Sequence, residues 1–216
     1  MKKGVRVWDL PTRLFHGLLF LTICAAVLTA YIGGNAMAWH VRLGETVLAL
    51  LMFRLVWGFV GGRWSRFASF VFGPRTLWRY LRERGGGESV GHSPLAALSV
   101  WAMLAWLALQ VGTGLIADDQ IATTGPLAAK VSEATSERAS GWHSGPGQWG
   151  LYALVALHVL AVAVYALRKR NLLTPMISGD KLDLPEDTPA SRDSWGTRLL
   201  ALAVFALCAG IAYSLG

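Results

Sequence analysis

Long runs of apolar residues dominate the chain. Five of them approach or reach the length that an α-helix needs to cross the hydrocarbon core of a bilayer, about 20 residues. They cover residues 14–32, 41–60, 95–117, 149–167 and 199–215, and the last is the shortest. The ten-residue alternating segments of a membrane β-barrel are absent from the sequence. The pattern therefore predicts an all-α membrane protein with five transmembrane helices.

Composition agrees with a membrane location. Apolar residues make up 54% of the chain and charged residues 15%, against about 25% charged residues in an average soluble domain. The net charge is +7, but Lys and Arg bracket the apolar runs and form no stripe of the kind that binds nucleic acid. We therefore expect membrane lipid, and no nucleic acid, as a partner. Cys24 and Cys208 lie inside apolar runs and are interpreted as buried apolar side chains.

Lys and Arg are distributed unevenly between the two ends of the apolar runs. Most lie before the first run, between the second and third, and after the fourth, whereas the opposite ends carry Arg42, Lys130 and Arg138. Because basic loops stay in the cytoplasm, the N-terminus is predicted to be cytoplasmic and the C-terminus extracytoplasmic. An alternative is a cleaved secretory signal ending at residues 36–38 (Ala-Met-Ala). The first run exceeds the 7–15 apolar residues that are typical of such signals, which favours a retained helix.

Four histidines at or within the predicted helices are candidates for chemistry. His16 and His158 lie inside apolar runs, and His40 and His143 lie at extracytoplasmic starts of runs. Ionisable groups at membrane depth are costly and are usually functional. His143 and His158 would lie about 22 Å apart along a continuous helix and about 60° apart around it, so both can face one interior. By depth, His16 pairs with His158 and His40 pairs with His143.

Two facing imidazoles are the axial ligands that a b-type haem takes, and the apolar interior of a helical bundle suits the porphyrin. We therefore expect two haems b, with His16, His158, His40 and His143 as the metal ligands. A zinc site is an alternative, although no carboxylate or Cys joins these histidines at one depth. Proton relay is another use of buried histidine. A proton-linked transporter is disfavoured because broken helices and inverted repeats are not apparent.

Two arginines are candidates for binding the haem propionates. Arg54 lies inside the second run, about 21 Å deeper than His40 on nearly the same helix face, and Arg13 lies less than one turn before His16. Guanidinium groups bind carboxylates through charge-assisted hydrogen bonds. The alternatives are that Arg54 snorkels to the headgroups and that Arg13 only anchors the topology. His92 is interpreted as an interfacial residue that caps the third helix or contacts a porphyrin edge.

The segments between the runs are predicted to differ in kind. Residues 61–94 are basic, with an amphipathic segment around 74–81 followed by a glycine-rich turn. Residues 118–148 form a predicted extracytoplasmic loop, long enough to meet a partner. Residues 171–198 contain three prolines and are interpreted as a linker. The predicted organisation is a haem-binding core at 1–181, a linker at 182–198 and an additional transmembrane helix at 199–216.

Several motifs, in order, resemble the prokaryotic cytochrome b561 family, which includes the b-type cytochrome subunits of nickel-iron hydrogenases. They are residues 7–16 (VWDLPTRLFH), 40–44 (HVRLG), 53–58 (FRLVWG), 91–95 (GHSPL) and 156–159 (ALHV). The resemblance covers about residues 5–181. It implies a four-helix transmembrane bundle with two haems b, ligated by His16, His40, His143 and His158; the fifth, C-terminal helix is additional to this core.

The resemblance also implies a function and a place in the cell. A family member would lie in the bacterial inner membrane and carry electrons between ubiquinone or menaquinone and an extracytoplasmic redox protein, such as a c-type cytochrome, a dehydrogenase or a hydrogenase. A superoxide:quinone oxidoreductase that acts without a protein partner is the alternative. Whether the chain is an enzyme or an electron-transfer subunit stays open, and no catalytic residue is assigned.

One departure from the family concerns the fourth helix. Residues 144–147 (Ser-Gly-Pro-Gly) stand between His143 and His158. Proline and neighbouring glycines weaken a helix, so a kink or break is predicted there. The separation of about 22 Å estimated for a continuous helix is therefore an upper bound.

Overall fold

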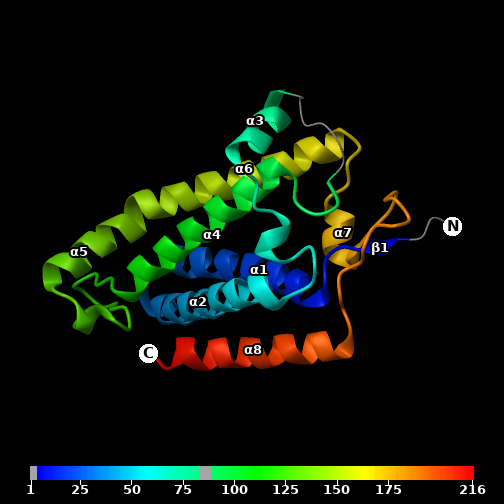
Figure 1. Cartoon of the computed structure of the whole chain (residues 1–216). Helices are drawn as coiled ribbons and strands as arrows, with labels where there is room; N and C mark the ends of the chain where they lie inside the picture. Colours follow the sequence, from blue (N-terminus) through cyan, green and yellow to red (C-terminus); the bar gives the residue numbers. More distant parts are fainter. Residues whose placement is uncertain (1–3, 83–88) are drawn as a thin grey trace. The chain divides into compact units, whose positions relative to one another are not determined.

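Figure 1 shows the computed structural model, which describes residues 4–82 and 89–216. Within these residues, five helices are long and apolar enough to cross a membrane. They are α1 (Leu10–Ile32), α2 (Met37–Val60), α4 (Pro94–Leu115), α6 (Gln148–Leu167) and α8 (Trp195–Tyr213). The prediction of an all-α membrane fold is confirmed.

Each helix begins before the apolar run that predicted it. The first turn of α1, for example, contains Pro11 and Thr12, which a hydropathy pattern excludes. Hydropathy detects only the part of a helix that lies at hydrocarbon depth, whereas the hydrogen-bonded backbone continues into the headgroup region. The pattern therefore located the helices correctly but placed each start too late, and the third and fifth runs extend two residues past the ends of α4 and α8.

Shorter elements lie between the long helices. The predicted amphipathic segment forms α3 (Pro74–Arg82), and the predicted loop 118–148 contains the helix α5 (Glu133–Trp142). A π-helical turn, η4 (His143–Gly147), joins α5 to α6. The remaining elements are the 3₁₀ turns η1 (Gly34–Ala36), η2 (Phe67–Ser69) and η3 (Ala128–Lys130), the helix α7 (Leu173–Ser178) and two short strands, β1 (Val5–Arg6) and β2 (Asp180–Lys181).

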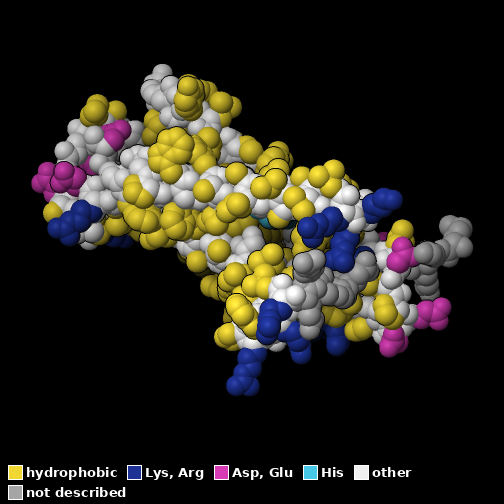
Figure 2. Space-filling view, turned by 90° about the horizontal axis from the view of Figure 1, so that it is seen from above, with side chains coloured by type: hydrophobic (Ala, Val, Ile, Leu, Met, Phe, Trp, Pro, Cys, Tyr) yellow, Lys and Arg dark blue, Asp and Glu magenta, His cyan; other side chains and the backbone are white. Residues whose placement is uncertain are grey.

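Most apolar side chains of the long helices face outward. In their most apolar windows, only 6% to 44% of the residues are buried inside the protein. Figure 2 shows hydrophobic side chains over much of the visible face, with Lys and Arg gathered in separate clusters. A soluble protein rarely exposes apolar patches of this kind, whereas a helix that faces lipid requires them.

The chain divides into two compact units, which are described separately. Unit 1 consists of Met1–Leu14, Arg54–Ala102 and His158–Leu202. Unit 2 consists of Phe15–Phe53, Met103–Leu157 and Ala203–Gly216. All five long helices contribute residues to both units, so each unit contains one end of every candidate span.

A buried carboxylate organises unit 1. Asp9 is 0% exposed, and its Oδ1 accepts a hydrogen bond from the backbone N–H of Thr12 at 2.9 Å, which caps α1. Its Oδ2 accepts from the Gly62 N–H at 2.7 Å and from Trp57 Nε1 at 3.2 Å, and Ser65 Oγ donates to Oδ1 at 3.3 Å. The motif at residues 7–16 thus fastens the start of α1 to the end of α2.

The segment before α8 also packs in unit 1. Asp193 accepts hydrogen bonds from Arg6 Nη1 at 2.7 Å, from Arg198 Nε at 3.0 Å and from the Leu10 N–H at 3.2 Å. Burial raises the pKa of Asp193, but the hydrogen bonds and charges of these partners outweigh it, so the pKa lies below its ordinary value. β1 pairs with β2 in an antiparallel arrangement. The segment that leads to α8 therefore contacts the N-terminal residues.

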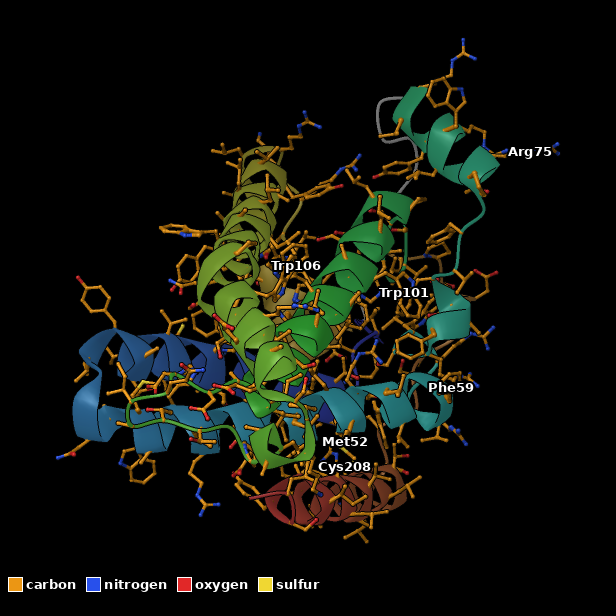
Figure 3. The ribbon with its side chains drawn as sticks, turned by 90° about the vertical axis from the view of Figure 1, so that its left-hand side faces the viewer. Met52, Phe59, Arg75, Trp101, Trp106 and Cys208 are labelled. Carbon is orange, nitrogen blue, oxygen red and sulfur yellow. The ribbon has the colours of Figure 1, made fainter. Side chains whose placement is uncertain are left out.

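In unit 2, α8 packs against α2. Thr46 Oγ1 and the Tyr213 hydroxyl are 2.6 Å apart, and the rings of Phe53 and Phe205 meet edge to face with centroids 6.1 Å apart. Figure 3 labels Met52 of α2 and Cys208 of α8 in this region.

The prediction that both cysteines are buried is right for Cys208 and wrong for Cys24. An apolar run does not distinguish a residue that packs inside the protein from one that faces lipid.

Candidate functional site

Unit 2 contains a cavity of about 380 Å³, within the range of about 300–1,000 Å³ that is common for ligand sites. Residues of α1, α2, α4, α5, η4 and α6 line it, together with part of the 116–132 segment. Much of the lining is apolar, including Ile23, Val27 and Leu107. His40 and His143 also line the cavity, so the structure places two of the predicted ligands at one site.

The two imidazole rings lie close together. Their centroids are 5.9 Å apart, and their planes meet at 81°. His40 Nδ1 lies 2.9 Å from the backbone carbonyl oxygen of Ala26, and His143 Nδ1 lies 2.8 Å from that of Gln110. A carbonyl oxygen only accepts hydrogen bonds, so each Nδ1 carries the proton and donates it. Each ring is left with a lone pair on Nε2, the form of histidine that ligates a metal ion.

The π-helical turn presents His143 to the cavity. Gly145, with φ −107° and ψ −110°, departs from helical geometry, and Pro146 supplies no backbone N–H. The predicted kink between the histidines of the fourth helix is therefore confirmed. π-Bulges are frequent at functional sites because they reorient neighbouring side chains. Here the break occurs directly after a candidate ligand.

Two side chains of α4 compensate for this break. Gln110 Nε2 donates to the carbonyl oxygen of His143 at 2.9 Å, and Trp106 Nε1 donates to that of Gly147 at 2.8 Å. Figure 3 labels Trp106 on α4. Buried carbonyl groups without partners are costly, so these donors stabilise the turn. Sequence reasoning missed both residues, although a Gln inside an apolar run was a usable signal.

A glycine of α4 makes room for the ring of His143. A Cβ atom at Gly114 would lie 2.7 Å from His143 Cε1 and 3.1 Å from Nδ1, closer than ordinary van der Waals contact. A Cβ atom at Gly112 would meet nothing within 4 Å. Of the two glycines, Gly114 alone is therefore required for the close approach of α4 to His143.

The donor set fits a planar group with two axial ligands better than a zinc ion. Among residues 4–82 and 89–216, no cluster of three or more His, Cys, Asp and Glu side chains is placed to bind a metal ion, and zinc sites use at least three protein ligands. A haem b would take two imidazole ligands, and its porphyrin faces suit an apolar cavity. The 5.9 Å between His40 and His143 and the apolar lining fit a haem.

The other predicted pair is divided between the units. His16 lies on α1 in unit 2, and His158 lies on α6 in unit 1. Their pairing at a second haem therefore stays a prediction.

Arg54 is buried in unit 1 and does not reach the surface. Its side chain is 4% exposed, and its guanidinium carbon lies 4.7 Å from the ring centroid of Phe67 and 5.9 Å from that of Phe70. The alternative that Arg54 snorkels to the headgroups is thus wrong. Its Nη1 has no hydrogen-bond partner among the described residues. A buried cation of this kind is costly unless an anion pairs with it.

Arg13 also has interactions beyond those of a topology anchor. Its Nη1 donates to the carbonyl oxygen of Ile177 at 2.6 Å, and its Nη2 lies 3.8 Å from Asp193 Oδ2. Its Nε is buried and lacks an acceptor in the described part of the chain. Unit 1 therefore contains two arginines with unused donor groups.

His92 lies in an aromatic slot of unit 1. Its ring centroid is 4.8 Å from that of Trp8 and 4.4 Å from that of Phe70. Burial, and then the charge of Arg54, lowers its pKa to about 3, so the ring is neutral at physiological pH. The predicted capping role belongs to the next residue instead: Ser93 Oγ accepts a hydrogen bond from the Ala96 N–H at 3.3 Å.

The charged residues that line the cavity of unit 2 are acidic. They are Glu45 and Asp119, and the described lining includes no Lys or Arg. Backbone N–H groups of Thr123, Ala122 and Ile121 lower the pKa of Asp119 to about 2, so this carboxylate is ionised at neutral pH. The site is therefore unfavourable for a small anion.

Two comparisons with known proteins found matches. A sequence model of a family described as prokaryotic cytochrome b561 matches residues 7–179. A relative from Bradyrhizobium diazoefficiens, named probable Ni/Fe-hydrogenase B-type cytochrome subunit, is 22% identical over 212 residues, covering 82% of this chain and 85% of the relative. No solved structure gave a significant match.

Proposed function

Because the chain belongs to the prokaryotic cytochrome b561 family and is thus a membrane cytochrome b with a role in electron transfer, we propose that it holds two haems b and connects the quinone pool to an extracytoplasmic redox protein. Each haem b, when bound, supplies an iron centre that takes up and releases one electron. The paired imidazoles of His40 and His143, 5.9 Å apart, are the observation that carries this proposal.

His40 and His143 are the proposed ligands of the first haem. The carbonyl groups of Ala26 and Gln110 hold each ring in the tautomer that offers Nε2 to iron. Apolar residues of the cavity exclude water from the porphyrin faces. Because α4 supports His143 through Gln110 and through the space at Gly114, the ligand is held in place before the cofactor arrives.

His16 and His158 are the proposed ligands of the second haem, as their depths in the sequence indicate. Arg54 and Arg13 are proposed to bind its propionates. The buried Nη1 of Arg54 and Nε of Arg13 support this assignment, since both donors lack an acceptor in the described residues. A propionate supplies both the acceptor and the negative charge that a buried guanidinium requires.

The proposed route of the electrons follows from the proposed orientation. With the N-terminus in the cytoplasm, the His40–His143 site lies toward the extracytoplasmic side of the bacterial inner membrane. A soluble or membrane-anchored redox protein exchanges electrons there, and ubiquinone or menaquinone reacts near the other haem. The name of the Bradyrhizobium relative supports a hydrogenase as one kind of partner. In this proposal residues 1–181 form the haem-binding core and α8 is an addition to it.

A superoxide:quinone oxidoreductase is the less favoured alternative. Superoxide is an anion, and enzymes attract anionic substrates with positive surface potential. The carboxylates Glu45 and Asp119 line the cavity of unit 2 instead. Stopped-flow mixing of the oxidised protein with superoxide tests this alternative: rapid haem reduction would favour it over a protein partner.

The experiment that tests the proposal counts haems. Purified protein is expected to show b-type absorption in a reduced-minus-oxidised spectrum and a haem-to-protein ratio near two. His40→Ala and His143→Ala should each retain one haem, the same one in both cases. His16→Ala and His158→Ala should each retain the other.

Tyr152→Phe provides a matched control, because Tyr152 lines the cavity without a ligating role, and it should keep both haems. Normal helical content with no b-type absorption would refute the proposal. Retention of both haems by His40→Ala and His143→Ala would refute the assignment of these ligands.

A further inference from the structure

The short helix α3 has three distinct faces. Thr76, Leu77 and Tyr80 are partly buried and face the protein, whereas the other residues of α3 are exposed. On a helical wheel of about 100° per residue, Arg75, Arg79 and Arg82 fall within about 60° of one another. Trp78 and Leu81 occupy an adjoining sector of similar width. Figure 3 shows Arg75 projecting outward from α3.

A tyrosine pair fixes the depth of α3 in unit 1. The hydroxyl groups of Tyr80 and Tyr165 are 3.3 Å apart. Tyr165 lies in the last turn of α6, which ends at Leu167, and the basic residues 168–170 follow directly. Tyrosine and basic residues gather where a spanning helix leaves the hydrocarbon. The contact therefore places α3 beside the end of a span, at the level of the headgroups.

The exposed part of α3 combines apolar and basic side chains. Trp78 is 65% exposed and Leu81 is 51% exposed, and the neighbouring Val71 and Phe72 are exposed as well. Residues 61–82 contain five arginines and no acidic residue. A helix of this composition lies in the plane of a membrane, with its apolar side at the acyl boundary and its cations at the headgroups.

We propose that α3 is a binding site for anionic lipids of the surrounding bilayer. Trp78 and Leu81 insert at the acyl boundary, and Arg75, Arg79 and Arg82 bind lipid phosphates by charge-assisted hydrogen bonds. The positive charge, with no acidic residue in the helix, selects anionic over zwitterionic lipid. The proposal is independent of the haem ligands, because it concerns a surface of unit 1 that none of them occupies.

Native mass spectrometry of the full-length holoprotein tests the proposal. The protein is titrated with phosphatidylglycerol and, separately, with phosphatidylcholine. A cation near a membrane surface contributes a factor of about five to the binding of anionic lipid. Each single change, R75Q, R79Q or R82Q, should therefore weaken phosphatidylglycerol binding about fivefold, and R75Q/R79Q about 25-fold. Binding of phosphatidylcholine should not change.

The matched control is K130Q/R138Q, which removes the same charge from two exposed residues of unit 2. It should keep wild-type affinity for phosphatidylglycerol. Equal losses in the control and in R75Q/R79Q would overturn the proposal, because net charge alone would then explain them. If R75Q/R79Q keeps the wild-type affinity for phosphatidylglycerol, the proposal is also overturned. This holds even if the variant has lost a protein that co-purifies with the wild type. If the double variant folds poorly, the single variants R75Q, R79Q and R82Q still test the proposal.

Discussion

A single methyl group on α4 should disable one of the two proposed haem sites. In Gly114→Ala, the new Cβ atom would lie 2.7 Å from His143 Cε1 and 3.1 Å from Nδ1. Ordinary contact between such atoms begins at 3.4 Å, so the ring must move by roughly 0.7 Å or more, and overpacking of this kind costs about 1–3 kcal/mol. The imidazole has little freedom to move, because its Nδ1 is bonded to the Gln110 carbonyl oxygen at 2.8 Å.

The expected result is loss or weakening of one haem while the other stays. A shift of this size lengthens the Nδ1 hydrogen bond and changes the position of the ring relative to His40. Metal sites commonly lose 10- to 100-fold in affinity when such an outer hydrogen bond is removed. The haem-to-protein ratio should fall from two toward one. Any protein that keeps both haems should show an altered low-spin electron paramagnetic resonance signal from one of them.

The matched control is Gly112→Ala, two residues away on the same helix. A Cβ atom there meets nothing within 4 Å, so both haems and their spectra should remain as in the wild type. The reasoning is refuted if Gly114→Ala keeps two haems with unchanged spectra. It is refuted equally if both alanine variants lose the same haem, because a general effect on α4 would then account for the loss.

Two further predictions concern unit 1. Asp9→Asn replaces one carboxylate oxygen, which accepts a hydrogen bond from the Gly62 N–H or the Thr12 N–H, by an amide group that donates. Because a buried donor left unpaired costs about 1–3 kcal/mol, the melting temperature of the variant should fall. An unchanged melting temperature would contradict the role given to Asp9. His92 has a pKa of about 3 in the folded protein, below the value of about 6.5 expected on unfolding. Below pH 6.5 the unfolded chain therefore binds a proton that the folded chain does not, and stability should fall by about 2–3 kcal/mol between pH 6.5 and pH 4.5. Denaturation curves of His92→Phe should not show this part of the decrease in stability. An equal decrease in the variant would show that another group causes it.

The break in the fourth helix illustrates how a local irregularity serves a site. A proline inside a helix removes one backbone hydrogen bond, and its ring clashes with the carbonyl group four residues before it. Gln110 and Trp106 satisfy the two carbonyl groups at His143 and Gly147. Gln110 and Trp106 are therefore best understood as partners of the π-helical turn.

Much of the architecture could be predicted because it depends on local composition. An apolar run of about 20 residues has few structural options besides a spanning helix, since every backbone polar group must be satisfied within the run. The amphipathic segment that became α3 and the break at Gly145 follow from short-range rules of the same kind. The pairing of His40 with His143 was also accessible, because depth along a helix is proportional to residue number.

Tertiary packing alone decided how the candidate site is supported. The carbonyl oxygens of Ala26 and Gln110 that orient the two imidazoles belong to the backbone, which is the same for every residue type and leaves no trace in a sequence. The distinct roles of Gly112 and Gly114, and the burial of Arg54 beneath two aromatic rings, depend on which neighbour lies across the interface. A pattern along one chain records how apolar a residue is, whereas contacts between helices determine whether it meets lipid, a ring or a cofactor.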